Sequence, residues 1–132
     1  MTAETNLSQL LRDLTPQLNS GIYVFATISD INQVGRQHII GEFKEAEGTT
    51  LIMEKSKAEA LGLSYDFQAS WITLMVHSSL HAVGLTAKVS TELAKNNISC
   101  NVIAGYYHDH IFVAVEDTDS ALEVLTNLSE SQ

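Results

Sequence analysis

Two segments of this chain repeat one pattern, which favours a fold made of two similar halves. The run Leu51–Ser56 matches the run Phe112–Asp117 at an offset of 61 residues (112 minus 51), and each leads toward a helical segment. The strand-like runs that begin at Ile22 and Trp71 match at an offset of 49 (71 minus 22). The second half therefore carries 12 more residues (61 minus 49), where an amphipathic helix is predicted. We expect two halves on one plan, the first of which lacks a helix.

The length and composition are those of a folded protein with one continuous core. The chain has 132 residues, of which 45% are hydrophobic and 17% charged, a balance that disordered chains do not show. Its single cysteine, Cys100, cannot form an internal disulfide and lies in a run typical of a half-buried strand. We therefore predict that Cys100 is a small core residue rather than a nucleophile.

The charge excludes several classes of partner. Sixteen acidic residues against seven basic ones give a net charge of −9, and no Lys/Arg cluster is present to neutralise phosphates. Neither nucleic acid nor an anionic membrane surface is expected to bind such a chain. No apolar run approaches the roughly 20 residues that span a bilayer, and residues 1–8 lack the features of a secretory signal. We expect a cytoplasmic protein.

The first half is predicted to begin with a helix. Leucines recur at helical spacing, Asn6 or Thr5 can cap the first turn, and Pro16 discourages continuation. A turn at Asn19–Gly21 and a central strand should follow, and then a loop and a hairpin closed by Glu45–Gly48. Ser56 is predicted to cap a short helix that ends before a left-handed Gly62. The leucines of the stripe are 7, 10, 11, 14 and 18, and the predicted strands are Ile22–Ile28, His38–Lys44 and Thr49–Met53.

The second half is predicted to run strand, helix, strand, strand, helix. A long strand, Tyr65–Val76, contains Trp71 in the core, and an apolar stripe then defines a helix that ends at Asn96–Asn97. Two further strands flank a tight connection, and Asp117 caps the last helix. The stripe consists of Leu85, Val89, Leu93 and Ala94, and the two strands are Cys100–Tyr106 and Ile111–Val115.

Two motifs carry a resemblance to a known family. The run from His77 to Leu80 with the run Val83–Thr86 (HSSL, VGLT), and the turn Gly105–His110 (GYYHDH), resemble those of a bacterial family of paired ACT-like domains. The chain is also similar to the paired ACT domains of a eukaryotic arginine sensor. This resemblance implies an α+β, ferredoxin-like fold with a mostly antiparallel sheet and helices on one side. It implies two fused ACT-like halves, residues 1–68 and 69–132.

The resemblance also implies a role. ACT domains are regulatory and commonly bind amino acids where two domains meet, so we expect a non-catalytic small-molecule sensor without a cofactor, assembled as a homodimer or higher homo-oligomer. Backbone groups at Gly84 and the positive end of the following helix would suit a ligand carboxylate. The expected ligand-binding residues are His77, Ser78, Ser79, Val83, Gly84, Leu85, Asn101, Val102, Ile103 and Ala104.

One position departs from the family pattern. Many ligand-binding ACT domains place an Asp three residues before the loop glycine, where it engages an amine, and here that position is His81. An imidazole does not replace a fixed carboxylate at neutral pH. Asp30 or Asp109 would have to supply the negative charge.

Other interpretations of the same residues stay open. Gly84 can serve only the turn into the helix, and Ser78 and Ser79 can merely cap the loop. The chain can then be a structural homo-oligomeric module without a ligand. A third interpretation is a small metal-dependent enzyme that uses four of the histidines, with Asp109 as an acid/base group. Those histidines are 77, 81, 108 and 110.

Overall fold

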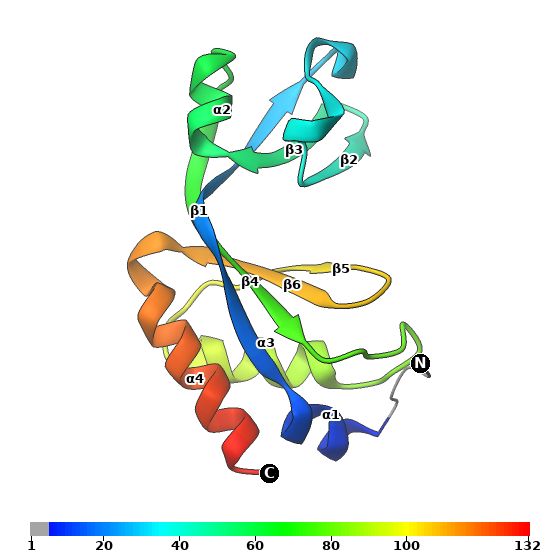
Figure 1. Ribbon diagram of the computed structural model, residues 1–132, viewed down its shortest axis with the longest axis vertical. Helices are drawn as coiled ribbons and strands as arrows, with labels where there is room; N and C mark the ends of the chain where they lie inside the picture. Colours follow the sequence, from blue (N-terminus) through cyan, green and yellow to red (C-terminus); the bar gives the residue numbers. More distant parts are fainter. Residues whose placement is uncertain (1–5) are drawn as a thin grey trace. The chain divides into compact units, whose positions relative to one another are not determined.

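Six strands and four α-helices make up residues 6–132, the part of the chain that the computed structural model describes (Figure 1). The strands form one sheet in the order β2-β3-β1-β4-β6-β5. The elements are α1 (Leu7–Asp13), β1 (Thr15–Ile28), β2 (Gly41–Glu45), β3 (Gly48–Glu54), α2 (Lys55–Ala60), β4 (Tyr65–Met75), α3 (Leu85–Lys95), β5 (Asn101–Ala104), β6 (Asp109–Ala114) and α4 (Thr118–Glu130).

The chain divides into two compact units. Unit 1 consists of residues 6–19 and 70–132, and unit 2 of Ser20–Ala69. Strands β1 and β4 each contribute one part to either unit, because the boundaries fall within them. The compact units are thus interleaved in sequence, whereas the halves 1–68 and 69–132 describe the sequence repeat and stay a prediction.

The two units share the predicted plan. Unit 1 runs β4-α3-β5-β6-α4, and unit 2 runs β1-β2-β3-α2 with two 3-10 turns, Ile31–Gln33 and Arg36–His38, where unit 1 has helix α3. The β2–β3 and β5–β6 pairs are antiparallel hairpins. The α+β, ferredoxin-like fold predicted from the sequence is therefore confirmed.

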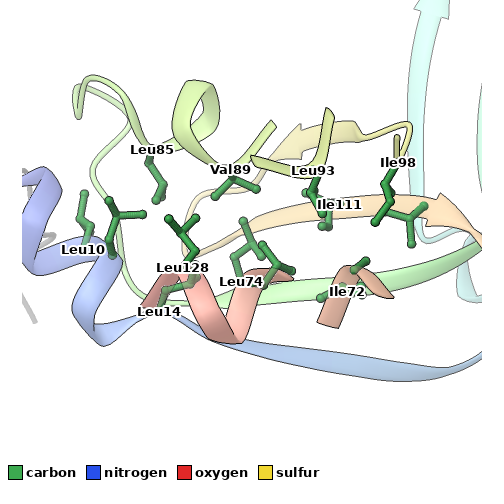
Figure 2. Packing of buried hydrophobic residues seen from close by; sticks show 14 residues of the cluster. Leu10, Leu14, Ile72, Leu74, Leu85, Val89, Leu93, Ile98, Ile111 and Leu128 are labelled. Atoms are coloured by element: carbon green, nitrogen blue, oxygen red, sulfur yellow. The ribbon is translucent and has the colours of Figure 1, made fainter. Parts of the chain in front are cut away.

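The core of unit 1 lies between its helices and one face of its strands. Leu85, Val89 and Leu93 of α3 point toward β4 and β6 and are buried, as the periodicity predicts, whereas Ala94 is exposed (Figure 2). Helices α3 and α4 lie side by side (Figure 1). The strands contribute Ile72, Leu74, Ile111 and Val113, and the other helices contribute Leu10, Leu11, Ala121, Leu125 and Leu128.

Unit 2 has a smaller core of its own. Its buried residues come from β1, β3 and α2, together with one residue of the loop between β1 and β2. They are Val24, Ile28, Val34, Leu51, Met53 and Ala58.

Several local predictions are confirmed. The side chain of Asn6 accepts a hydrogen bond from the amide of Gln9 at 3.0 Å and caps α1. Gly62 has the left-handed φ of +68° expected after α2. Cys100 packs against the core of unit 1, and burial raises the pKa of its thiol to about 11, so the sulfur stays protonated and unreactive near neutral pH.

The predicted N-terminal helix is too long. Helix α1 ends at Asp13, and Leu18 lies in strand β1 with 45% of its surface exposed. The expected turn at Asn19–Gly21 is wrong too, since these residues continue β1. Asn19 donates hydrogen bonds to the carbonyl of Trp71 and to the hydroxyl of Thr73, which fixes the strand beside β4. Such long-range bonds override a local turn preference.

Two cap residues and one strand start also differ from the predictions. Helix α2 begins at Lys55 with Glu54 at its N-cap, so Ser56 lies inside the helix. Asp117 stands at the N-cap of α4, but its side chain makes no capping hydrogen bond. Strand β2 begins at Gly41, because Arg36–His38 forms a 3-10 turn.

The packing of α3 yields a stability prediction. Leu93→Ala should lower the free energy of unfolding by about 2–5 kcal/mol, because Leu93 is fully buried and its removal leaves a cavity. Leu80→Ala is the matched control, since Leu80 is 69% exposed and should change stability by less than about 0.5 kcal/mol. Urea denaturation measures both, and equal effects would contradict this core.

Candidate functional site

A cavity of about 140 Å³ lies in unit 1 where the chain passes from β4 into α3. The loop after β4, the first turn of α3 and the ends of β5 and β6 form its walls. Its residues are Ser78, Ser79, Leu80, Ala82, Gly84, Leu85, Thr86, Ala104 and Asp109.

Local hydrogen bonds shape the loop after β4. The amide of Ser78 donates to the carbonyl of Val76 at 3.1 Å, and the amide of Ala82 donates to the carbonyl of Ser79 at 2.9 Å. The hydroxyl of Ser79 accepts from the amide of His81 at 3.0 Å. Ser79 therefore has the turn-capping role expected of serine in loops. It also lines the cavity.

Gly84 ends the loop at the N-cap of α3. Its φ of +103° disfavours any side chain, and a Cβ atom there would lie 3.0 Å from Cδ2 of Leu7. The predicted need for glycine in this turn is thus explained by both conformation and space. A substitution at Gly84 would strain the turn as well as alter the cavity, so it does not test binding by itself.

The first turn of α3 gives the cavity a positive wall. Helix α3 has no side-chain capping hydrogen bond, because its N-cap residue is Gly84. The first amide groups of any α-helix have no carbonyl partner inside the helix. These amides and the helix dipole favour an anionic group. Gly84, Leu85 and Thr86, from this end of α3, line the cavity.

Asp109 gives the same cavity a negative wall. It opens β6 opposite Ala104 of β5, and both residues line the cavity. Burial raises the pKa of the Asp109 carboxyl group, and this effect is opposed by the charge of His110, a hydrogen bond from the Ser78 hydroxyl and the charge of His108. Ser78 itself is buried, with 8% of its surface exposed.

The structure brings part of the predicted site together. Five of the expected residues line the cavity, namely Ser78, Ser79, Gly84, Leu85 and Ala104. The other five do not line it. The ring of His77 contacts that of Tyr107, Val83 is 83% exposed, Asn101 donates to the carbonyl of Phe112, Val102 packs against the core, and Ile103 pairs with His110.

Four residues of the cavity are absent from the site that the sequence predicts. The sequence indicates Asp109 only as a source of charge or as an acid/base group. Leu80, Ala82 and Thr86 lie inside the predicted loop but are not among the expected ligand-binding residues. The strand register would have revealed Asp109, because Ala104 and Asp109 are partners across the β5–β6 hairpin. His81, in contrast, is exposed and does not line the cavity.

The histidines proposed as metal ligands have different surroundings. Nδ1 of His108 lies 3.2 Å from the carbonyl oxygen of Val76, and Nδ1 of His110 accepts from Nε1 of Trp71 at 3.0 Å. Within residues 6–132, no three side chains of His, Cys, Asp or Glu are grouped so as to hold a metal ion.

Asp109 supports a prediction about pH and stability. Because the pKa of Asp109 is raised, the folded state holds its proton to higher pH than the unfolded state, and stability falls as pH rises through this range. Asp109→Asn should therefore raise the melting temperature at pH 7, and the gain should shrink toward pH 4. Calorimetry at both pH values measures this. A lower melting temperature at pH 7 would show that the carboxylate stabilises the fold.

Within residues 6–132, no helix is both long and apolar enough to cross a membrane.

Comparisons with known proteins agree with this architecture. No curated protein matches the chain. The crystal structure of a protein of unknown function from Vibrio cholerae, described as a possible transport protein, is 46% identical and covers 93% of this chain and 95% of its own, with a TM-score of 0.85. A protein from Agrobacterium tumefaciens is 16% identical, with coverage of 88% and 89% and a TM-score of 0.72. The regulatory subunit of aspartate kinase from Thermus flavus is 9% identical, with coverage of 86% and 96% and a TM-score of 0.65.

The family itself is shown by two matches along the sequence. An ACT domain matches residues 2–70, and a second ACT domain matches residues 66–127. Together with the ferredoxin-like plan of the two units, these matches show that the chain belongs to the ACT domain family and carries two ACT domains in tandem.

Proposed function

We propose that this protein is a non-catalytic regulatory module that binds a small amino acid in the cavity of unit 1. The observation that carries the proposal is the pair of opposite walls, the first turn of α3 on one side and Asp109 on the other. An α-amino acid carries both charges within a few bonds. Its carboxylate would accept from the first-turn amides, and its ammonium group would donate to Asp109.

Asp109 takes over the role that the family pattern assigns to the position of His81. The ammonium group of an amino acid needs a fixed negative charge, and Asp109 supplies one at the cavity wall. Ser78 donates to the Asp109 carboxyl group and orients it. The departure at His81 is therefore compatible with amino-acid binding in this chain. Five of the expected residues lie outside the cavity wall, namely His77, Val83, Asn101, Val102 and Ile103. In this proposal they do not contact the ligand.

The cavity limits the size of the ligand. Its volume of about 140 Å³ is well below the roughly 300–1,000 Å³ of pockets for drug-sized molecules. The apolar part of its wall comes from Leu80, Ala82, Leu85 and Ala104, which favours a short apolar or hydroxyl side chain. Glycine, alanine and serine fit this description, and arginine or phenylalanine do not.

The regulatory part of the proposal rests on the family. The Thermus flavus protein is described as a regulatory subunit of aspartate kinase, and a chain of two ACT domains suits the same kind of role. We place the protein in the cytoplasm as a homodimer or higher homo-oligomer, in which ligand binding shifts association with an output partner.

Thermal stability in the presence of single amino acids tests the proposal. A ligand at 100 times its dissociation constant should stabilise the protein by about 2.7 kcal/mol. Glycine, alanine or serine should raise the melting temperature, whereas arginine and phenylalanine should not. Alaninamide, which lacks the carboxylate, and lactate, which lacks the amine, should both fail if both walls are used.

Variants assign the response to the cavity. Asp109→Asn should abolish the response, since the neutral amide does not pair with the ammonium group. Asp66→Asn is the matched control, because Asp66 is an exposed aspartate of unit 2, and it should respond like the wild type. A flat panel at millimolar ligand would contradict the proposal, and a dimer in size-exclusion chromatography would then favour the structural module.

A further inference from the structure

A hydrogen-bonded cluster lies on the sheet of unit 1 and links three strands. We call it the indole cluster; it consists of Asn19 of β1, Trp71 and Thr73 of β4, and His110 of β6. Nε1 of Trp71 donates to Nδ1 of His110 at 3.0 Å, and Oγ1 of Thr73 lies 3.2 Å from the same nitrogen. Nδ2 of Asn19 donates to Oγ1 of Thr73 at 3.0 Å.

The indole cluster lies on the face of the strands opposite the core. Side chains alternate along a strand, and Ile111 and Val113 of β6 and Ile72 and Leu74 of β4 belong to the core of unit 1. His110, Trp71 and Thr73 therefore point to the other face. Asp109, the neighbour of His110, lines the cavity. The first two residues of β6 thus join the indole cluster to the cavity.

The hydrogen bond from Trp71 determines which ring nitrogen of a neutral His110 carries the proton. An indole N–H only donates, so Nδ1 of His110 must carry a lone pair, and a neutral ring then has its proton on Nε2. Addition of a proton to Nδ1 ends the bond from Trp71. The new N–H has an acceptor nearby in Oγ1 of Thr73, which has lone pairs free to accept beside the bond from Asn19. The two protonation states of His110 therefore have different partners on β4.

The charges around His110 are few. The charges of His108, in the preceding turn, and of Asp109, in β6, change the pKa of its ring. The neighbouring groups on the other strands do not titrate near neutral pH; they are Asn19 of β1, Trp71 and Thr73 of β4, and Ile103 of β5. Burial lowers the pKa of His110, the charge of His108 lowers it further, and Asp109 raises it. The neutral ring is thus the form that the fold prefers at pH 7.

We propose that His110 is a proton-operated switch, which on acidification exchanges its bond from Trp71 for a bond to Thr73 and so changes how the start of β6 is held against β4. The switch is a property of unit 1 and requires no ligand. It acts on the residue next to Asp109, so it gives the cavity a sensitivity to pH.

Intrinsic fluorescence reports the switch directly, because Trp71 is the only tryptophan of the chain. Titration of the wild type from pH 8 to pH 5 should show one transition, with a midpoint below the ordinary histidine value of about 6.5. In the same range, the signal of the indole N–H in proton NMR should move as its acceptor is lost.

Three variants separate the switch from a general effect of acid. His110→Asn keeps an acceptor for the indole but does not titrate, so its fluorescence should be constant from pH 8 to pH 5. Thr73→Val should lower the midpoint, since the protonated ring loses its acceptor. His108→Asn is the matched control and should keep the transition with a higher midpoint, because one positive neighbour is removed.

Two results would overturn the proposal. One is a wild-type midpoint at or above 6.5, and the other is a transition that persists in His110→Asn. If His110→Asn does not fold, the NMR signal of the wild type decides alone, because an indole signal that stays fixed while His110 titrates would show that the bond is not exchanged.

Discussion

The packing of α3 against β4 and β6 is the interaction on which the candidate site depends. Leu85, Val89 and Leu93 form one buried stripe of the helix, and they fix its position over Ile72 and Ile111. Leu85 belongs both to this core and to the cavity wall. The same contacts that stabilise unit 1 therefore hold the first turn of α3 across the cavity from Asp109.

The predictions that succeed are those that depend on neighbours in sequence. The stripe of α3, the cap at Asn6 and the left-handed Gly62 each depend on a few adjacent residues, and the structure confirms all three. The predicted turn at Asn19–Gly21 is wrong because the side chain of Asn19 bonds to β4, more than 50 residues away. No local pattern contains that information.

The same distinction between local and long-range contacts explains which residues of the site the sequence predicts. The loop residues from Ser78 to Leu85 are contiguous, so a motif identifies most of them as a group. Ala104 and Asp109 reach the cavity through the register of the β5–β6 hairpin. The sequence predicts the run Asn101–Ala104 as a block, yet only Ala104 lines the cavity. Alternation along a strand and a rise of about 3.3 Å per residue carry its neighbours to the other face or farther along.

The two units differ in the segment that α3 occupies in unit 1. Unit 2 has 3-10 turns of three residues where unit 1 has α3, and so short a turn offers no set of aligned free amides or sizeable dipole. The proposed amino-acid site therefore lies within unit 1, at the first turn of α3. Amide NMR of the ¹⁵N-labelled protein titrated with alanine tests this claim most directly. It should show saturable shifts at Leu85, Thr86, Ala104 and Asp109; shifts confined to residues 20–69, or none at all, would contradict it.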